Sequence, residues 1–171
     1  MLTSPELLTG LLAALLQLFL GLLAENAGEW FFHRYVFHGL GKRPGSLWNY
    51  HWSEHHHVAR ANHMLDPGYK SLPLRWNTQG KEAAFLIMVV ILHLPLLTLI
   101  PWYVCGLYAG LVLYYIRHRR SHIDPDWAAS HLPWHYEHHM GRVAEANWCI
   151  TWPWFDWIMG TRVRTDQIDI L

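Results

Sequence analysis

The chain carries no net charge, few charged residues and no motif for binding a nucleotide. Its 13 Lys and Arg residues balance 13 Asp and Glu residues, and only 15% of the 171 residues are charged. Without a basic excess, the sequence does not favour a nucleic-acid partner. No glycine-rich dinucleotide motif follows a strand pattern, and a chain of this length has no room for a separate haem or flavin domain. We therefore expect neither nucleic-acid binding nor a redox-cofactor domain within this chain.

Cysteine is also scarce. Cys105 lies in a hydrophobic stretch and Cys149 in an aromatic one, and they lack the CxxC spacing of a zinc or redox motif. A free cysteine commonly behaves as a small buried hydrophobic residue. We interpret both as core residues or free thiols.

Apolar residues, in contrast, make up 52% of the chain, with 11 Trp and 8 Tyr. This composition is typical of a small integral membrane protein, which we interpret as a single domain over residues 1–171. One apolar run extends from Leu7 to Leu23, and a second extends from Ala83 to Ile116 and is divided by Pro101. Each of the three resulting pieces is long enough for a short crossing. We predict an all-α integral membrane protein with about three short transmembrane helices, at approximately residues 5–28, 82–100 and 101–118.

The basic residues predict the topology. All 13 Lys and Arg residues fall in two stretches, from Arg34 to Lys81 and from Arg117 to Arg164. Three crossings place both stretches on one side of the membrane, and by the positive-inside rule that side is cytoplasmic. We expect a cytoplasmic helical cap formed by residues 33–81 and 118–171. A cleaved signal peptide is the alternative for the first apolar run, but that run has no basic segment before it and no convincing small-residue cleavage site, so we interpret it as a retained helix.

Ten of the 14 histidines form four groups that flank the apolar segments. The groups are His33 and His38; His51, His55 and His56; His118 and His122; and His135, His138 and His139. Neutral imidazole is the commonest metal ligand among side chains, and most of these spacings place imidazoles on one side of a helix. On a continuous α-helix, however, His38 would lie about 140° around from His33. Surface histidines are the alternative, but four groups on one predicted side favour a dimetal site in the cap.

Residues near these groups have predicted supporting roles. A metal-bound imidazole usually donates its other N–H group to a carboxylate or carbonyl. Candidates for this role are Glu29, Glu54, Glu137, Asp124 and Asn147. We interpret His57, His63 and His131 as supporting or solvated residues. His93 lies in the middle of an apolar run, remote from the four groups, where a hydrogen-bonded core or tunnel-lining role is favoured over metal binding.

Four sequence strings carry a family resemblance. HRYVFH at 33–38, HWSEHH at 51–56, HRRSH at 118–122 and HYEHH at 135–139 resemble the histidine boxes of the fatty acid hydroxylase and sterol desaturase superfamily. The segment NWCITWPWFDWIMGTR at 147–162 is similar to the segment that closes many members. The resemblance extends from about Glu29 to Arg162.

The resemblance implies a non-haem di-iron membrane oxygenase. Its metal ligands would be the ten grouped histidines, holding two iron ions, which zinc can replace during purification. Dioxygen would be the cosubstrate, and the reaction would be hydroxylation of an aliphatic C–H bond of a lipid such as a fatty acyl chain, a sterol-like ring or a carotenoid. Desaturation of a lipid at the same site is the alternative. Electrons would come from a separate ferredoxin, cytochrome or reductase.

Two other classes of protein remain as alternatives. A bis-histidine haem electron carrier needs paired histidines within the membrane, where only His93 lies. A zinc-binding membrane protein or metal transporter would place its ligands near the midplane of the spans, whereas here they lie at one end. We expect a bacterial inner membrane location with a cytoplasmic site, or the endoplasmic reticulum in a eukaryote.

Overall fold

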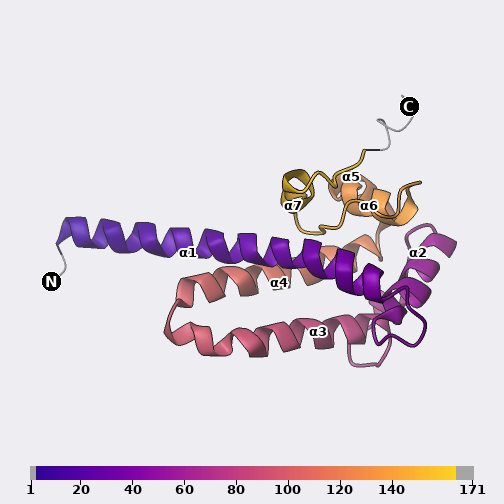
Figure 1. Ribbon diagram of the computed structural model, residues 1–171, viewed down its shortest axis with the longest axis horizontal. Coiled ribbons are helices and arrows are strands. Elements are labelled where there is room, and N and C mark those ends of the chain that lie inside the picture. Colours follow the sequence, from indigo (N-terminus) through magenta and orange to yellow (C-terminus); the bar gives the residue numbers. More distant parts are fainter. Residues whose placement is uncertain (1–2, 165–171) are drawn as a thin grey trace.

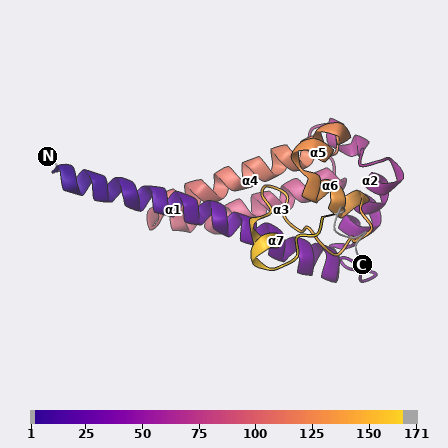
Figure 2. The same cartoon turned by 90° about the horizontal axis from the view of Figure 1, so that it is seen from above.

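The computed structural model describes residues 3–164, which form a long helical stem and a cap of short helices. The stem contains α1 (Ser4–Phe31), α3 (Thr78–His93) and α4 (Pro101–Ser121). The short 3₁₀ helix η4 (Leu94–Thr98) joins α3 to α4 in a hairpin, and α1 extends well beyond the hairpin at its N-terminal end (Figures 1 and 2). Residues 3–164 contain no β-strand, so the predicted all-α fold is confirmed.

Glycines allow α1 and α4 to approach each other closely. A Cβ atom added at Gly21 would overlap the backbone carbonyl oxygen of Tyr103, and one added at Gly106 would overlap that of Leu18. Small residues permit this kind of backbone contact between helices in apolar surroundings. The contact fixes the line along which α1 and α4 pack, and both helices carry histidines at their cap ends.

Two helical stretches in the described part are long and apolar enough to cross a membrane, Ser4–Leu40 and Thr78–Thr98. They contain most of the first two predicted spans, and leucines on the outer face of α1, such as Leu8, Leu12 and Leu16, are more than half exposed. The third predicted span coincides with α4, which is not among these two stretches. A third crossing therefore stays a prediction.

The cap is built from two parts of the chain that meet at one end of the stem (Figure 1). The first part contains the π-helices η1 (Phe32–Leu40) and η2 (His51–His56), then α2 (His57–Ala61) and the 3₁₀ helix η3 (Pro67–Lys70). The second contains α5 (Pro125–His131), α6 (Pro133–Met140) and α7 (Trp154–Ile158). These parts lie almost entirely within the segments predicted for the cap, 33–81 and 118–171, of which 165–171 are outside the described residues; the cytoplasmic location of the cap stays a prediction.

The segment before α7 packs against the end of α1. Trp30 packs against Trp148 and Cys149 in a small buried cluster. The backbone N–H groups of Trp148 and Cys149 both donate to the buried carboxylate of Asp156 at 2.9 Å. The sequence prediction for the cysteines is confirmed, because Cys149 is buried in this core and Cys105 is a free thiol.

Candidate metal centre

Eight of the ten predicted ligands lie in two buried groups of four. In each group, one ring nitrogen from every histidine lies within 4.8 Å of the others. We define the first quartet as His33, His38, His56 and His138, and the second quartet as His55, His118, His122 and His139. Histidines from all four sequence groups therefore converge, as the sequence predicted.

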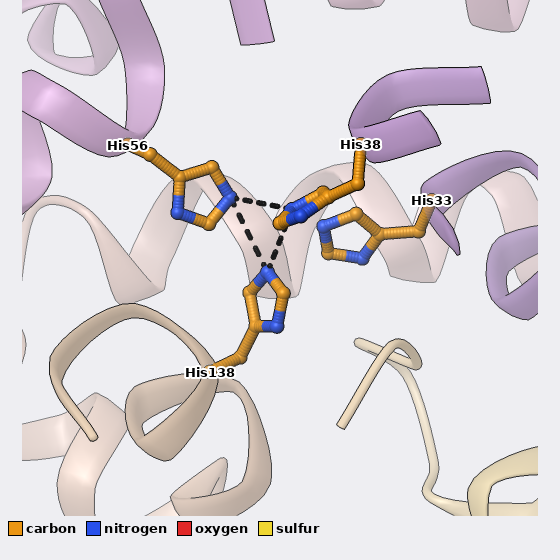
Figure 3. Close-up of side chains that lie close together, drawn as sticks. All are labelled: His33, His38, His56 and His138. Atoms are coloured by element: carbon orange, nitrogen blue, oxygen red, sulfur yellow. Dashed lines mark hydrogen bonds between the residues drawn. The ribbon is translucent and has the colours of Figure 1, made fainter. Parts of the chain in front are cut away.

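The first quartet joins η1, η2 and α6. Figure 3 shows that its rings converge, with dashed lines joining the Nε2 atoms of His38, His56 and His138. His38 Nε2 lies 3.0 Å from His56 Nε2, and His138 Nε2 lies 3.2 Å from each of these two atoms. His33 Nε2 is buried without a hydrogen-bond partner.

Backbone carbonyls fix the ring orientation of two members of this quartet. His33 Nδ1 lies 2.6 Å from the carbonyl oxygen of Trp148, and His138 Nδ1 lies 2.7 Å from that of Ala146. A carbonyl only accepts, so in each ring the proton is on Nδ1 and the lone pair is on Nε2. The segment before α7, which packs against Trp30 at the end of α1, thus orients both rings so that their lone pairs face the quartet centre.

The second quartet joins η2, α4 and α6. His118 Nε2 lies 3.2 Å from His122 Nε2. His122 Nδ1 donates to the carbonyl oxygen of Met64 at 2.9 Å, and His118 Nδ1 donates to Glu82 Oε1 at 2.5 Å. Both Nε2 lone pairs therefore face the same small space. The ring nitrogens of His139 are buried there without a hydrogen-bond partner.

These donor sets fit metal ions. Nitrogens bound at about 2.0–2.1 Å to one ion lie about 3.0–3.4 Å apart, which matches the observed Nε2 separations. Converging lone pairs repel each other unless a cation lies between them, and metal binding requires neutral imidazole. Burial lowers the pKa of His56, His122, His138 and His139 well below its ordinary value, because the charged ring would lose its hydration. The rings are therefore held neutral and ready to bind.

The two quartets are neighbours that share elements. His55 and His56 are adjacent in the chain but belong to different quartets, and so are His138 and His139. The ring of His56 stacks on that of His139 with 4.3 Å between centroids. Two ions bound in the quartets would thus be close together, as a dinuclear centre requires.

The π-helical turns explain how histidines five residues apart reach one quartet. The His38 ring lies 5.1 Å from the His33 ring, whereas a continuous α-helix would place the two side chains about 140° apart. A π-helix closes its hydrogen bonds from i to i+5 and winds more loosely, so residues five apart come near one face. The same turn in η2 brings His51 within 4.9 Å of His56, between ring centroids.

The remaining two predicted ligands lie beside the quartets. The His51 ring is 4.9 Å from that of His33, and its Nε2 atom is buried without a partner. His135 Nε2 lies 3.4 Å from His122 Nε2 in the second quartet. Each quartet therefore has a fifth imidazole next to it, and all ten predicted ligands converge.

The other four histidines lie outside both quartets, as predicted. His57, His63 and His131 are exposed on the cap. His93 donates from Nδ1 to the carbonyl oxygen of Val89 at 2.8 Å and lines a cavity within the stem. This position agrees with the hydrogen-bonded or tunnel-lining role predicted for it.

The five predicted supporting residues make their recorded hydrogen bonds with other groups. Glu29 accepts from the backbone N–H groups of Ile150 and Thr151, Glu54 pairs with Lys81, Glu137 pairs with Arg162, Asp124 caps α5 at Trp127, and Asn147 bonds to Arg162 and Val163. The hydrogen bonds described above for the histidine rings come from other residues, so a supporting role for these five stays a prediction.

Two acids that the sequence prediction missed contact the second quartet. Glu82 is buried at the start of α3, where it accepts from His118 Nδ1 and from Tyr69 Oη at 2.7 Å. Asp66 Oδ2 lies 3.8 Å from His55 Nδ1. In the first quartet, His38 Nδ1 lies 3.3 Å from Glu145 Oε1. The only sequence signal for Glu82 is its position immediately before the long apolar run.

Removal of the Glu82 carboxylate is expected to lower the metal affinity of the second quartet selectively. In Glu82→Leu, His118 loses the acceptor that fixes its ring, and loss of such a partner typically lowers metal affinity about 10- to 100-fold. Chelator competition would measure the affinity. Glu54→Leu is the matched control, because Glu54 is half exposed and pairs with Lys81. An equal loss in both variants would contradict the role assigned to Glu82.

The fold and the site together define a helical protein with apolar stretches long enough to cross a membrane and a histidine-rich centre suited to two metal ions. A family model described as fatty acid hydroxylase matches residues 18–161, which is most of the chain. The chain belongs to the fatty acid hydroxylase family, which implies an oxidoreductase. No curated protein and no solved structure matches it significantly.

Proposed function

We propose that this protein is a dioxygen-dependent di-iron hydroxylase that oxidises an aliphatic C–H bond of a membrane lipid. The observation that carries the proposal is the position of His33, which belongs to the first quartet and also lines an apolar cavity of about 210 Å³ between the stem helices. A hydrocarbon chain inside this cavity would approach the ion held by the first quartet. The family membership supports the same reaction class.

Iron is the metal that makes this arrangement an oxidoreductase. Bound ferrous iron would supply the electrons that activate dioxygen, whereas zinc has no redox chemistry. The overall reaction joins one oxygen atom to the substrate carbon and reduces the other to water, so it consumes two electrons and two protons. This sequence contains no glycine-rich dinucleotide motif after a strand pattern, and we propose that a separate ferredoxin, cytochrome or reductase supplies the electrons.

The protein's own residues would position the lipid and exclude water. Phe32, Phe37 and Phe85 line the cavity next to His33. An apolar wall favours a hydrocarbon and keeps bulk water away from the reacting carbon. We propose a fatty acyl chain, a sterol-like ring or a carotenoid as the substrate class.

The proposed setting is a membrane that the stem crosses three times. The two apolar stretches and the exposed leucines of α1 support embedding of the stem. All the basic residues lie outside the predicted spans except Arg117, which is at the cap end of the third, and this distribution favours a cap on the cytoplasmic side. A bacterial inner membrane is the proposed location, with the endoplasmic reticulum as the equivalent in a eukaryote.

Lipid mass spectrometry of cells with and without the gene, grown under ¹⁸O-labelled dioxygen, tests the reaction. We expect a lipid that gains one labelled oxygen atom only when the gene is present. Loss of two hydrogens with label found only in water would indicate a desaturase instead. Stoichiometric zinc in anaerobically purified protein, with no activity after exchange for iron, would overturn the oxidoreductase proposal.

A further inference from the structure

The cavity beside His33 extends along α1 into the stem. Its wall is mostly apolar and includes side chains from α1, α3 and α4. Besides His33 and the hydroxyl groups of Tyr103 and Tyr114, three of its residues, Glu25, Glu29 and His93, carry polar side chains. No lysine or arginine lines the cavity within the described part of the chain. The cavity therefore has a polar region away from its metal end.

Glu25 is the exceptional residue in this wall. Its side chain is buried, with only 5% of the residue exposed, and neither carboxyl oxygen accepts a hydrogen bond. Glu29 differs, because its carboxylate accepts from the N–H groups of Ile150 and Thr151 at 2.7 and 3.0 Å. Glu29 is thus satisfied by the backbone, whereas Glu25 has capacity left for a ligand.

The position of Glu25 is set by a glycine of α4. A Cβ atom added at Gly110 would lie 2.8 Å from both Cγ and Oε2 of Glu25, so only glycine leaves room for the carboxyl group. Burial of a polar group without a hydrogen bond costs free energy. The fold holds Glu25 in the cavity wall despite this cost, which points to a ligand that satisfies it.

On Glu25 and His93, the polar atoms open to a ligand are acceptors, whereas the Tyr103 and Tyr114 hydroxyl groups in the same wall can also donate. Both carboxyl oxygens of Glu25 can therefore accept a hydrogen bond from a donor on a ligand. His93 uses its Nδ1–H group for the Val89 carbonyl, so its Nε2 atom is also an acceptor. A ligand that donates a hydrogen bond matches this region.

We propose that Glu25 recognises a hydrogen-bond donor, a hydroxyl or amine group, on a lipid whose hydrocarbon portion occupies the rest of the cavity. Glu25 and His33 are eight residues apart on one continuous helical segment, a separation of about 12 Å along the axis. The carbon nearest the first quartet would therefore lie about 12 Å from the donor group. The position of this carbon rests on the proposed function, whereas recognition of the donor group by Glu25 requires no oxidation.

The test compares four probes that share a twelve-carbon chain. Dodecan-1-ol and dodecylamine donate hydrogen bonds, whereas methyl dodecyl ether only accepts and dodecane does neither. Their binding to the full chain in lipid nanodiscs, without dioxygen, is measured by isothermal titration and by the shift in unfolding temperature. One added hydrogen bond corresponds to about a tenfold preference for dodecan-1-ol over the ether. A wild-type protein without this preference would overturn the proposal.

Two variants assign the preference to Glu25. In Glu25→Leu, the ratio of the affinities for dodecan-1-ol and the ether should fall to about one. Glu25→Gln retains a carbonyl acceptor and should still prefer dodecan-1-ol over the ether. It should lose any preference for dodecylamine that depends on the charge of Glu25. If Glu25→Leu does not fold, Gly110→Ala serves instead, because its Cβ atom would displace the carboxyl group. An unchanged ratio in a folded Glu25→Leu or Gly110→Ala protein contradicts the proposal.

Glu54→Leu is the matched control, since it removes an exposed glutamate that does not line the cavity and should keep the full preference. The outcome is separable from that of the proposed function. Donor recognition that depends on Glu25, without oxidation of any lipid, would leave the binding site valid and the reaction wrong. Oxidation of a lipid by a protein with no donor preference would support the reaction and contradict donor recognition by Glu25.

Discussion

His138→Ala is expected to remove one metal ion and to abolish lipid oxidation. His138 is buried, and its Nε2 atom lies 3.2 Å from those of both His38 and His56, so its loss opens the first quartet on the side of α6. Loss of a group that hydrogen-bonds to a ligand typically lowers metal affinity about 10- to 100-fold. Loss of the ligand itself should lower the affinity by about 100-fold or more. Metal analysis of anaerobically purified protein should show about half the wild-type content, and product should fall below detection.

His57→Ala is the matched control for that result. His57 follows directly after His56 in the chain, but its side chain is exposed and belongs to neither quartet. The variant should retain wild-type metal content and product formation, and so should His63→Ala on the cap surface. Equal losses in all three variants would contradict the assignment of the quartets, as would a His138→Ala protein that keeps its full metal content.

The convergence of the ten histidines could be predicted from the sequence because ten imidazoles in four groups have few other reasons to occur together. The division of the histidines between two quartets could not be predicted. It depends on the loosely wound turns η1 and η2; in η2, for example, His51 and His56 come close although they are five residues apart. A pattern based on the α-helical period assigns such residues to different faces.

The supporting acids could not be predicted for a different reason. Sequence proximity selected Glu54 and Glu137, whose side chains pair with Lys81 and Arg162. Glu82 is 36 residues before His118 and reaches it only because α3 packs beside α4. Hydrogen bonds between helices depend on tertiary packing, which the spacing along one helix does not contain. The apolar stretches, in contrast, can be identified from the sequence alone, and two of the three predicted spans correspond to helical stretches with the length and hydropathy of a crossing.

Gly21→Ala is expected to cause a large loss of stability, because α1 and α4 touch through their backbones at this position. The added methyl group would overlap the Tyr103 carbonyl oxygen and approach the Leu107 nitrogen, and neither atom can move by a change of rotamer. The helices would have to separate, at a cost of about 1–3 kcal/mol or more. His33 follows α1 and His118 lies on α4, so separation should also misalign both quartets and lower metal retention.

The same substitution at Gly10 separates this packing effect from helix propensity. Gly10 lies in the same helix, but nothing lies within 4 Å of a Cβ atom added there. Gly10→Ala should therefore leave metal content unchanged and favour the helix by up to about 1 kcal/mol. Thermal unfolding in nanodiscs and metal analysis of both variants measure the difference. If Gly21→Ala were as stable as Gly10→Ala and retained its metal, the close contact between α1 and α4 would not be what aligns the two halves of the metal centre.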